Sequence, residues 1–172
     1  MMKMLAKNFF NRPTLVVARD LLGKFLVRRL KGKNVAFIIT EVEAYDGFRD
    51  RASHASRGKT ARNAPMFGPA GCWYVYFTYG MHWMLNIVCG QERYPAAVLI
   101  RGVQGISGPA RLTKKVKIDK QFNGRPAERK TGLWIEDRGI KIPPSKIKKS
   151  PRVGVHYAGP YWSKKNWRFF LI

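Results

Sequence analysis

One stretch of this chain carries no charged side chain, although the rest of the sequence is strongly basic. From Asn63 to Gln91 there is no Asp, Glu, Lys or Arg. Residues that interrupt an apolar run recur along it: Pro65, Gly68, Pro69, Gly71, Thr78, Gly80, His82 and Asn86. A membrane-spanning helix needs about 20 consecutive apolar residues, so this stretch does not fit one. We expect two core strands instead, Trp73 to Tyr79 and Met81 to Val88, joined by a bend or hairpin at Gly80.

The net charge points to a polyanionic partner. The chain has 33 Lys and Arg against 10 Asp and Glu, which gives a net charge of +23. Nucleic acid is therefore the first candidate partner. A membrane surface is the second, but we find no basic amphipathic helix or lipidation motif and expect no membrane association. We find no signal peptide, and Cys72 and Cys89 lack paired-ligand spacing, so we expect reduced thiols in an intracellular protein.

The length of 172 residues suits one domain, and we expect a single domain over residues 1–172 without linker or repeat. Besides the two core strands, the residue patterns predict helices and strands at these positions: a helix over 14–22, a hairpin of strands 25–30 and 36–45, a strand over 96–101, a short helix from 108 to 116, a strand over 132–136, and closing strands over 153–157 and 168–172. Residues 46–65 and 142–151 are expected to be loops.

The predicted strand from Phe37 to Tyr45 carries two acids. Because side chains alternate along a strand, Glu41, Glu43 and Tyr45 should share one face, with Ile39 before them on that face. Two carboxylates next to a phenol are a candidate site for general acid–base chemistry. The residue pattern alone does not choose which acid takes part.

Several separated motifs resemble the alkyladenine (3-methyladenine) DNA glycosylase family, in order and from about Leu5 to Phe170. The matching segments are 41–45 (EVEAY), His54, Arg62-Asn63, Met66-Phe67, 74–76 (YVY), 79–81 (YGM), Asn86-Ile87, 98–101 (VLIR) and 151–155 (PRVGV). The resemblance implies a mixed α+β fold on a curved, mostly antiparallel β-sheet with flanking helices. It also implies a DNA repair enzyme without a cofactor, which works inside the cell where the DNA lies and is monomeric like similar glycosylases.

The activity implied by the resemblance is base excision. Such an enzyme flips an alkylated or deaminated purine, for example 3-methyladenine or hypoxanthine, out of double-stranded DNA and hydrolyses its N-glycosidic bond, leaving an abasic site. We expect a monofunctional glycosylase, because no lysine within the motifs offers itself as a Schiff-base nucleophile for lyase chemistry. We also expect no metal, since the three histidines are scattered and no cysteine pair flanks them.

The family positions assign roles to aromatic residues. Tyr79, next to Gly80, matches the residue that wedges into the duplex in place of the displaced base. Tyr45 and His54 match one wall of the base slot, and Tyr76 matches the other. Without the resemblance, core packing for the tyrosines and a solvated histidine would be the simpler interpretations.

The same match assigns the chemistry and the selectivity. Glu43 matches the general base that activates water, and Arg101 matches the residue that holds Glu43 and the water near the backbone. Asn86 matches the pocket-floor residue that excludes guanine through its 2-amino group. Glu41 is expected to be structural and paired with a basic residue. This chain departs from the family at residues 102–107 and in the charge of the loop 46–53, where Arg49 and Arg51 lie.

Many basic residues are expected to neutralise DNA phosphates; among them are Lys146, Lys148, Lys149, Arg152, Lys164 and Lys165. The competing hypothesis is a non-catalytic, basic nucleic-acid-binding protein. Glu41 and Glu43 distinguish the two, because a pure binder gains nothing from acids that face a polyanion.

Overall fold

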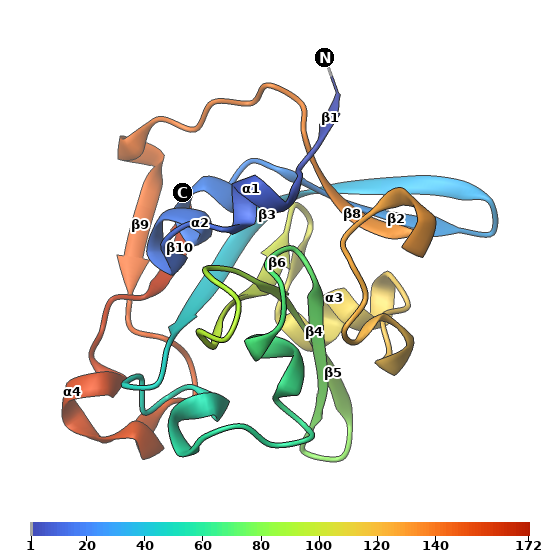
Figure 1. Ribbon diagram of the computed structural model, residues 1–172. Coiled ribbons are helices and arrows are strands. Elements are labelled where there is room, and N and C mark those ends of the chain that lie inside the picture. Colours follow the sequence, from blue (N-terminus) through green and yellow to red (C-terminus); the bar gives the residue numbers. More distant parts are fainter. Residues whose placement is uncertain (1) are drawn as a thin grey trace.

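The computed structural model describes residues 2–172 and shows one antiparallel sheet with short helices around it (Figure 1). The described residues form these strands: β1 (Lys3–Met4), β2 (Phe25–Leu30), β3 (Lys33–Asp46), β4 (Trp73–Thr78), β5 (His82–Val88), β6 (Ala96–Val103), β7 (Ile106–Ser107), β8 (Leu133–Asp137), β9 (Ile147–Ser150) and β10 (Arg168–Leu171). Every pairing recorded between them is antiparallel. The predicted mixed α+β fold is confirmed.

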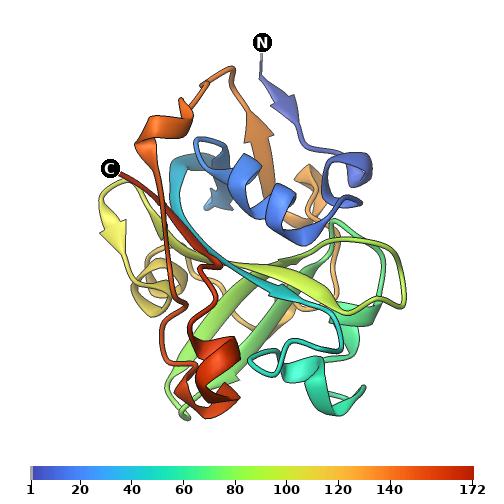
Figure 2. The ribbon, with the colours of Figure 1, turned by 90° about the vertical axis from the view of Figure 1, so that its left-hand side faces the viewer.

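The sheet follows the order β1-β8-β2-β3-β6-β5-β4, and β10 pairs with both β3 and β9. Within residues 2–172, four α-helices accompany it: α1 (Lys7–Phe10), α2 (Thr14–Leu21), α3 (Pro109–Lys115) and α4 (Gly159–Ser163). Short 3-10 helices fill the connections: η1 (His54–Arg57), η2 (Ala64–Phe67), η3 (Lys120–Phe122), η4 (Arg129–Thr131), η5 (Pro144–Lys146) and η6 (His156–Ala158). In the side view, α1 and α2 lie toward one end of the molecule, whereas α4 and the tip of the β4–β5 hairpin lie toward the other (Figure 2).

Local sequence explains why the first elements form where they do. Pro13 precedes α2 with φ −52°, and Gly23 follows it with φ +81°, a left-handed conformation that ends the helix. Val17 and Leu21 of α2 are fully buried. The helix predicted over 14–22 and the hairpin of β2 and β3 are confirmed, although β3 starts earlier and extends one residue further than expected.

The long strand β3 changes its pairing and its inward face halfway along. Its first part pairs with β2, and its second part pairs with β6 and β10. The register to β6 shifts on both sides of Glu41, so the alternation of side chains breaks there. Ile39 before the irregularity and Val42 after it both belong to the main core. The prediction that Ile39 shares a face with Glu43 is therefore wrong, because period two does not persist through a bulge.

The charge-free stretch forms the predicted core hairpin. Strands β4 and β5 pair directly, and the main core includes Trp73, Val75, Leu85 and Ile87 from them. At the tip, Tyr79 and Gly80 both have positive φ, +52° and +63°. The Met81 N–H donates to the Thr78 carbonyl oxygen at 3.1 Å, so Tyr79 and Gly80 are the central residues of a β-turn, and positive φ at both is typical of type I′. Three residues, 79–81, connect Thr78 to its partner His82.

The C-terminal third differs from the prediction. The segment expected as a closing strand, residues 153–157, contains a turn and the start of η6 instead. The loop expected over 142–151 contains η5 and strand β9, which pairs with β10. The alternation of valines at 153 and 155 resembles a strand pattern, but Val153 is exposed and no neighbouring strand pairs with it. None of the helices in residues 2–172 is long and apolar enough to cross a membrane.

Candidate active site

The floor of a pocket is built by one row of side chains across four adjacent strands. In the register of the sheet, Glu43 of β3 lies opposite Leu99 of β6, Leu99 lies beside Asn86 of β5, and Asn86 pairs with Tyr74 of β4. Side chains two residues away point to the same face. The neighbouring rows therefore bring in further residues on this face: Tyr45, Ala97, Arg101, Met84, Tyr76 and Thr78, all of which line the same pocket.

The pocket has a volume of about 280 Å³, close to the lower limit for sites that bind small organic groups. Loop residues complete it: Ala52, Ser53 and His54 on one side, and Val153, Gly154, Val155 and Tyr157 on another. Tyr79 stands at its edge. The predicted site residues Glu43, Tyr45, His54, Tyr76, Tyr79, Asn86 and Arg101 are thus all brought to one pocket.

Glu43 is a buried carboxylate with a partner on each oxygen. Its side chain is 0% exposed. The backbone N–H of Val153 donates to Oε1 at 2.7 Å, and the Tyr45 hydroxyl donates to Oε2 at 2.9 Å. Burial raises the pKa of Glu43, against the opposing effects of Arg101 and the Val153 hydrogen bond. A carboxyl held in this way is suited to take up a proton.

Glu41 lies in a different environment two residues earlier. Arg101 Nε donates to Glu41 Oε1 at 2.8 Å, and Arg168 Nε donates to the same oxygen at 2.6 Å. Burial opposes the charge of Glu41, but the hydrogen bonds from Arg168 and Arg101 outweigh it and lower the pKa. The expectation that Glu41 is paired with basic residues is confirmed.

Arg101 makes ionic contacts with both acids, Glu41 and Glu43. Its Nε binds Glu41, and its Nη1 lies 3.6 Å from Glu43 Oε1. The Glu41 pairing therefore holds the guanidinium in place, while the side facing Glu43 makes a looser ionic contact. This arrangement leaves the guanidinium able to interact with another negative group in the pocket.

The aromatic side chains of the pocket contact one another. The imidazole of His54 meets the Tyr76 ring edge to face, with centroids 4.6 Å apart and an angle of 76°. The Tyr74 and Tyr76 rings are 5.2 Å apart, and the Tyr74 hydroxyl lies 3.0 Å from His54 Nδ1. The two rings expected to face each other across a base, His54 and Tyr76, touch directly here. A flat ligand cannot lie between those two rings in this arrangement, whereas Tyr45 lines the pocket from β3.

The His54 loop is fixed by a buried amide. Asn63, 1% exposed, donates from Nδ2 to the carbonyl oxygens of His54 at 3.0 Å and Gly58 at 2.9 Å, and its Oδ1 accepts from Thr60 N–H at 2.7 Å. Although His54 is an exposed residue, partial desolvation of its imidazole, followed by the positive charge of Arg62, lowers the pKa of His54 to about 4. His54 is therefore neutral at neutral pH.

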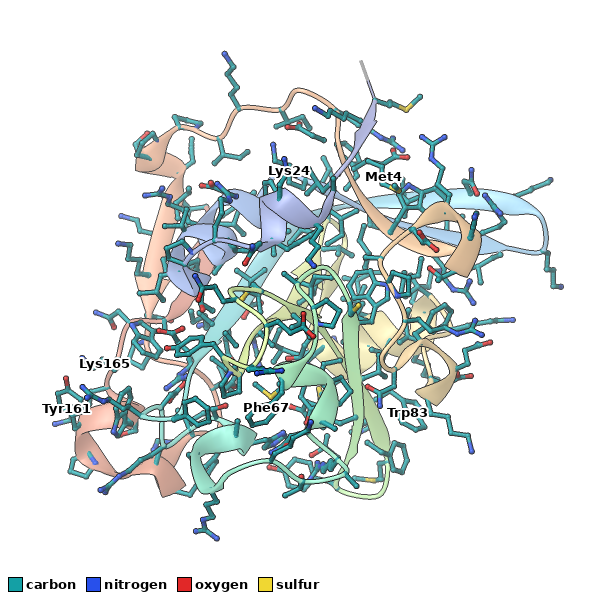
Figure 3. The ribbon with its side chains drawn as sticks, viewed as in Figure 1. Met4, Lys24, Phe67, Trp83, Tyr161 and Lys165 are labelled. Atoms are coloured by element: carbon teal, nitrogen blue, oxygen red, sulfur yellow. The ribbon has the colours of Figure 1, made fainter. Side chains whose placement is uncertain are left out.

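Asn86 is buried in the pocket, whereas Tyr79 at the edge of the pocket is exposed. Asn86 is 3% exposed and donates from Nδ2 to the carbonyl oxygen of Tyr74 at 3.1 Å. Tyr79, at the hairpin tip, is 84% exposed. Across the same hairpin, the Phe77 and Trp83 rings pack 4.7 Å apart and support the tip. Figure 3 shows Trp83 on this hairpin, well away from Tyr161 and Lys165 near α4.

A buried ion pair behind the pocket was not predicted. Arg152 and Asp50 are both 0% exposed in their side chains, with Nη1–Oδ2 at 2.6 Å and Nη2–Oδ1 at 2.9 Å. The assignment of Arg152 to phosphate binding is wrong, because its guanidinium does not reach the surface. The charge pattern of the sequence does not distinguish a buried arginine from an exposed one.

A second hollow of about 1060 Å³ adjoins the pocket and shares Ser53, His54, Thr78, Tyr79 and Tyr157 with it. Its lining includes four exposed arginines and no acid: Arg49, Arg51, Arg57 and Arg62. We call this hollow the arginine groove. It offers a continuous positive surface that leads to the mouth of the pocket.

Among the described residues, 2–172, no group of three or more His, Cys, Asp or Glu could hold a metal ion. Fold and pocket together define a class: an α+β protein with a buried carboxylate in an aromatic pocket beside a positively charged groove.

Comparison with known proteins assigns the family. The methylpurine-DNA glycosylase (MPG) family model matches residues 8–172, and the chain belongs to this family. A relative from Methanocella arvoryzae is 43% identical over 98% of this chain and 92% of its own. One from Streptomyces avermitilis is 40% identical (97% and 87%), and one from Wolbachia pipientis wMel is 42% identical (96% and 89%). All three are provisionally named 3-methyladenine DNA glycosylases. The resemblance seen in the sequence motifs is confirmed.

Proposed function

We propose that this DNA glycosylase removes alkylated or deaminated purines from double-stranded DNA by hydrolysing the N-glycosidic bond, and that Glu43 activates the water. The observation that carries the proposal is the position of Glu43. It is a fully buried carboxylate on the floor of an aromatic pocket, held by two hydrogen bonds and accompanied by Arg101. A polyanion-binding protein without chemistry would have no use for such an acid.

The damaged base enters the pocket from the duplex. Unstacking a nucleotide costs a few kcal/mol, and less for a damaged or mispaired base. Tyr79 fills the vacated position, for which its 84% exposure at a supported hairpin tip is suitable. In the pocket, Tyr45 and the pair of His54 and Tyr76 supply aromatic surfaces, each worth about 1 to 3 kcal/mol when a base stacks on it. The contact between His54 and Tyr76 must open, or the base must stack beside it.

The chemical step is a hydrolysis. Glu43, as the carboxylate, takes a proton from a water molecule whose oxygen bonds to the sugar C1′, while the C1′–N bond breaks and its electrons leave with the base. Positive charge develops on the sugar, and the carboxylate stabilises it. Arg101 helps to hold Glu43 and binds the neighbouring phosphate. A base alkylated on a ring nitrogen is already cationic and leaves as a neutral molecule.

Selectivity comes from the pocket floor. Asn86 is buried and fixed by its bond to the Tyr74 carbonyl, so it cannot swing away. A 2-amino group on the base, as in guanine, would collide with it. A site that binds purines in general needs a steric conflict to reject the normal base.

The DNA backbone follows the arginine groove. Four exposed arginines beside the pocket mouth neutralise phosphates without reading sequence. We further propose that the chain acts as a monomer and a single domain. It also acts without lyase chemistry, because no lysine is among the residues that line the pocket.

The test uses a duplex with one hypoxanthine, or one alkylated purine, followed by alkaline cleavage of abasic sites. The parent protein should produce breaks at the lesion, and Glu43→Gln should bind the duplex without producing them. A parent that binds tightly but leaves both lesions intact would overturn the enzymatic function and support the binding protein instead. For such a binder, Glu43→Gln should bind more tightly than the parent.

A further inference from the structure

The ion pair of Asp50 and Arg152 is costly to bury and is held by many partners. Besides Arg152, Asp50 accepts hydrogen bonds from the backbone N–H groups of Asp46 and Ala52, both at 3.1 Å. Two apolar side chains of similar size would be about as stable at such a position, or more so. The pair therefore calls for an explanation beyond stability.

Arg152 connects separate parts of the pocket wall. Its Nη1 also donates to the carbonyl oxygen of Ala44 at 2.9 Å, and Ala44 lies between Glu43 and Tyr45 on β3. Its guanidinium carbon lies 4.8 Å from the centre of the Tyr45 ring and 4.9 Å from that of Trp167. A planar guanidinium makes these contacts in one fixed orientation, which a lysine ammonium cannot reproduce.

The next residue after Arg152 contacts the candidate base. Val153 N–H donates to Glu43 Oε1 at 2.7 Å. Because the Arg152 side chain is locked to Asp50 and Ala44, the peptide that carries this N–H is locked as well. The loop that contains Asp50 is joined a second time, through the Tyr157 hydroxyl, which donates to the Ala52 carbonyl oxygen at 2.7 Å.

We propose that Arg152, held by Asp50, is a positioning residue that fixes the Val153 amide and the Tyr45 ring against Glu43 and so keeps the carboxylate aimed at the attacking water. The inference rests on the hydrolysis proposed above. Arg152 does not line the pocket, so it acts through Glu43 and its two hydrogen-bond donors. Displacing a catalytic group by about 1 Å can slow a reaction about a hundredfold.

The experiment compares two variants with a matched control. The double variant Asp50→Leu with Arg152→Met replaces the pair by apolar side chains, and Arg152→Lys keeps the charge but removes the planar fork. The control is Arg138→Lys, because Arg138 also pairs with a buried acid, Glu136, at 3.0 Å, and neither lines the pocket. Single-turnover rate at saturating protein, duplex affinity and melting temperature are measured for each.

Both test variants should fold and bind the duplex within about twofold of the parent, and their single-turnover rate should fall at least about tenfold. The control should keep the parental rate. A folded double variant that cleaves at the parental rate overturns the inference. If the double variant does not fold, Arg152→Lys decides in the same way, and a parental rate in it overturns the inference.

The pH profile separates positioning from a purely structural role. Arg101, Tyr45, Tyr76 and Tyr157 also face Glu43, and the variants leave them unchanged. In Arg152→Lys the charge is kept, but the Val153 and Tyr45 hydrogen bonds, which lower the pKa of Glu43, should weaken. The pKa of Glu43 should therefore rise, and the rate should begin to increase at higher pH than in the parent. A lower melting temperature with an unchanged profile would overturn the inference.

The outcomes also separate the two proposals. If the parent does not cleave either lesion, the proposed function fails, and the inference fails with it. If the parent cleaves and the variants cleave equally well, the inference alone fails.

Discussion

The pocket has a floor and an outer wall of different construction, and the two differ in what holds them. The floor consists of side chains from β3, β6, β5 and β4, whose directions follow from strand register. The outer wall consists of loop residues around His54 and Val153, which are held by single buried groups, Asn63 and the Asp50–Arg152 pair. The backbone ladder supports the floor, whereas a few side chains support the wall.

Because of this difference, the floor and the wall suit different tasks. The floor contains the groups that the proposed hydrolysis needs in fixed positions, Glu43, Arg101 and Asn86. The wall contains His54, which contacts Tyr76 and would have to move for a base to stack between the two rings. A rigid sheet for the chemistry and loops for recognition are a common division in enzymes. One wall residue nevertheless contacts the proposed general base, because the Val153 N–H donates a hydrogen bond to Glu43.

The largest expected effect comes from the two acids of the floor. Glu43→Gln should lower the single-turnover rate by about 10² to 10⁴, the usual contribution of a general base, without loss of stability at neutral pH. Glu41→Gln should instead destabilise the fold by about 2 to 3 kcal/mol, because it leaves Arg101 and Arg168 without their carboxylate. Rates and thermal melts of both variants measure the contrast.

The reverse outcome would exchange the roles of the two acids. If Glu41→Gln removed activity in a fully stable protein while Glu43→Gln kept it, Glu41 would be the base. The directions of the pKa shifts argue against this exchange. The pKa of Glu43 is raised, which suits a proton acceptor, whereas the pKa of Glu41 is lowered.

The pH dependence of the parent should show the same contrast. The pKa of Glu43 is raised, mainly by burial, so the rate should increase through a pH above the ordinary glutamate value of about 4.3. The same shift favours the folded state when Glu43 is protonated. This contribution to stability is fully present below the unfolded pKa and is lost as the pH rises through the folded pKa. Glu41, with a lowered pKa, contributes in the opposite sense and loses its contribution as the pH falls.

Rate and melting temperature measured from pH 4 to 8, in parent and Glu43→Gln, test this. Between the unfolded and folded pKa values of Glu43, the parent should gain activity and lose some stability as the pH rises, and the variant should lack that loss. A rate that is flat down to the ordinary glutamate pKa would contradict the raised value.

A smaller effect should come from the wall. Asn63→Ala removes the three hydrogen bonds that hold the His54 loop, so it should cost about 1 to 3 kcal/mol of stability and about tenfold in rate. The floor should be unaffected, so the pH at which the rate rises should not move. Asn34→Ala, at an exposed position near the start of β3 and outside the pocket lining, is the control and should change neither rate nor profile. A shifted pH profile in Asn63→Ala would show that wall and floor are not separable.

Much of the floor could be predicted from the sequence, and much of the wall could not. Period two within β3 places Glu43 and Tyr45 together, and the same rule applied to Tyr76 would have found Tyr74. It failed at Ile39, because a bulge depends on the partner strand. The wall depends on Asp50 meeting Arg152, which lies 102 residues away, and no local pattern encodes that contact. The resemblance to a family identified the residues of both regions, but only the structure shows how the wall is held.

The smallest effect, and a test of the surface outside the pocket, concerns Arg49 and Arg51 of the arginine groove. Each phosphate contact contributes about 0.9 to the slope of log affinity against log salt. Replacing both by Gln should therefore reduce the slope by up to about 2 and weaken duplex binding at low salt, with the single-turnover rate at saturation unchanged. Lys31→Gln with Lys33→Gln, at the β2–β3 turn, removes the same charge away from the groove lining and should leave the slope near the parental value. Equal loss of slope in both double variants would mean that overall charge, and not the groove, binds the backbone.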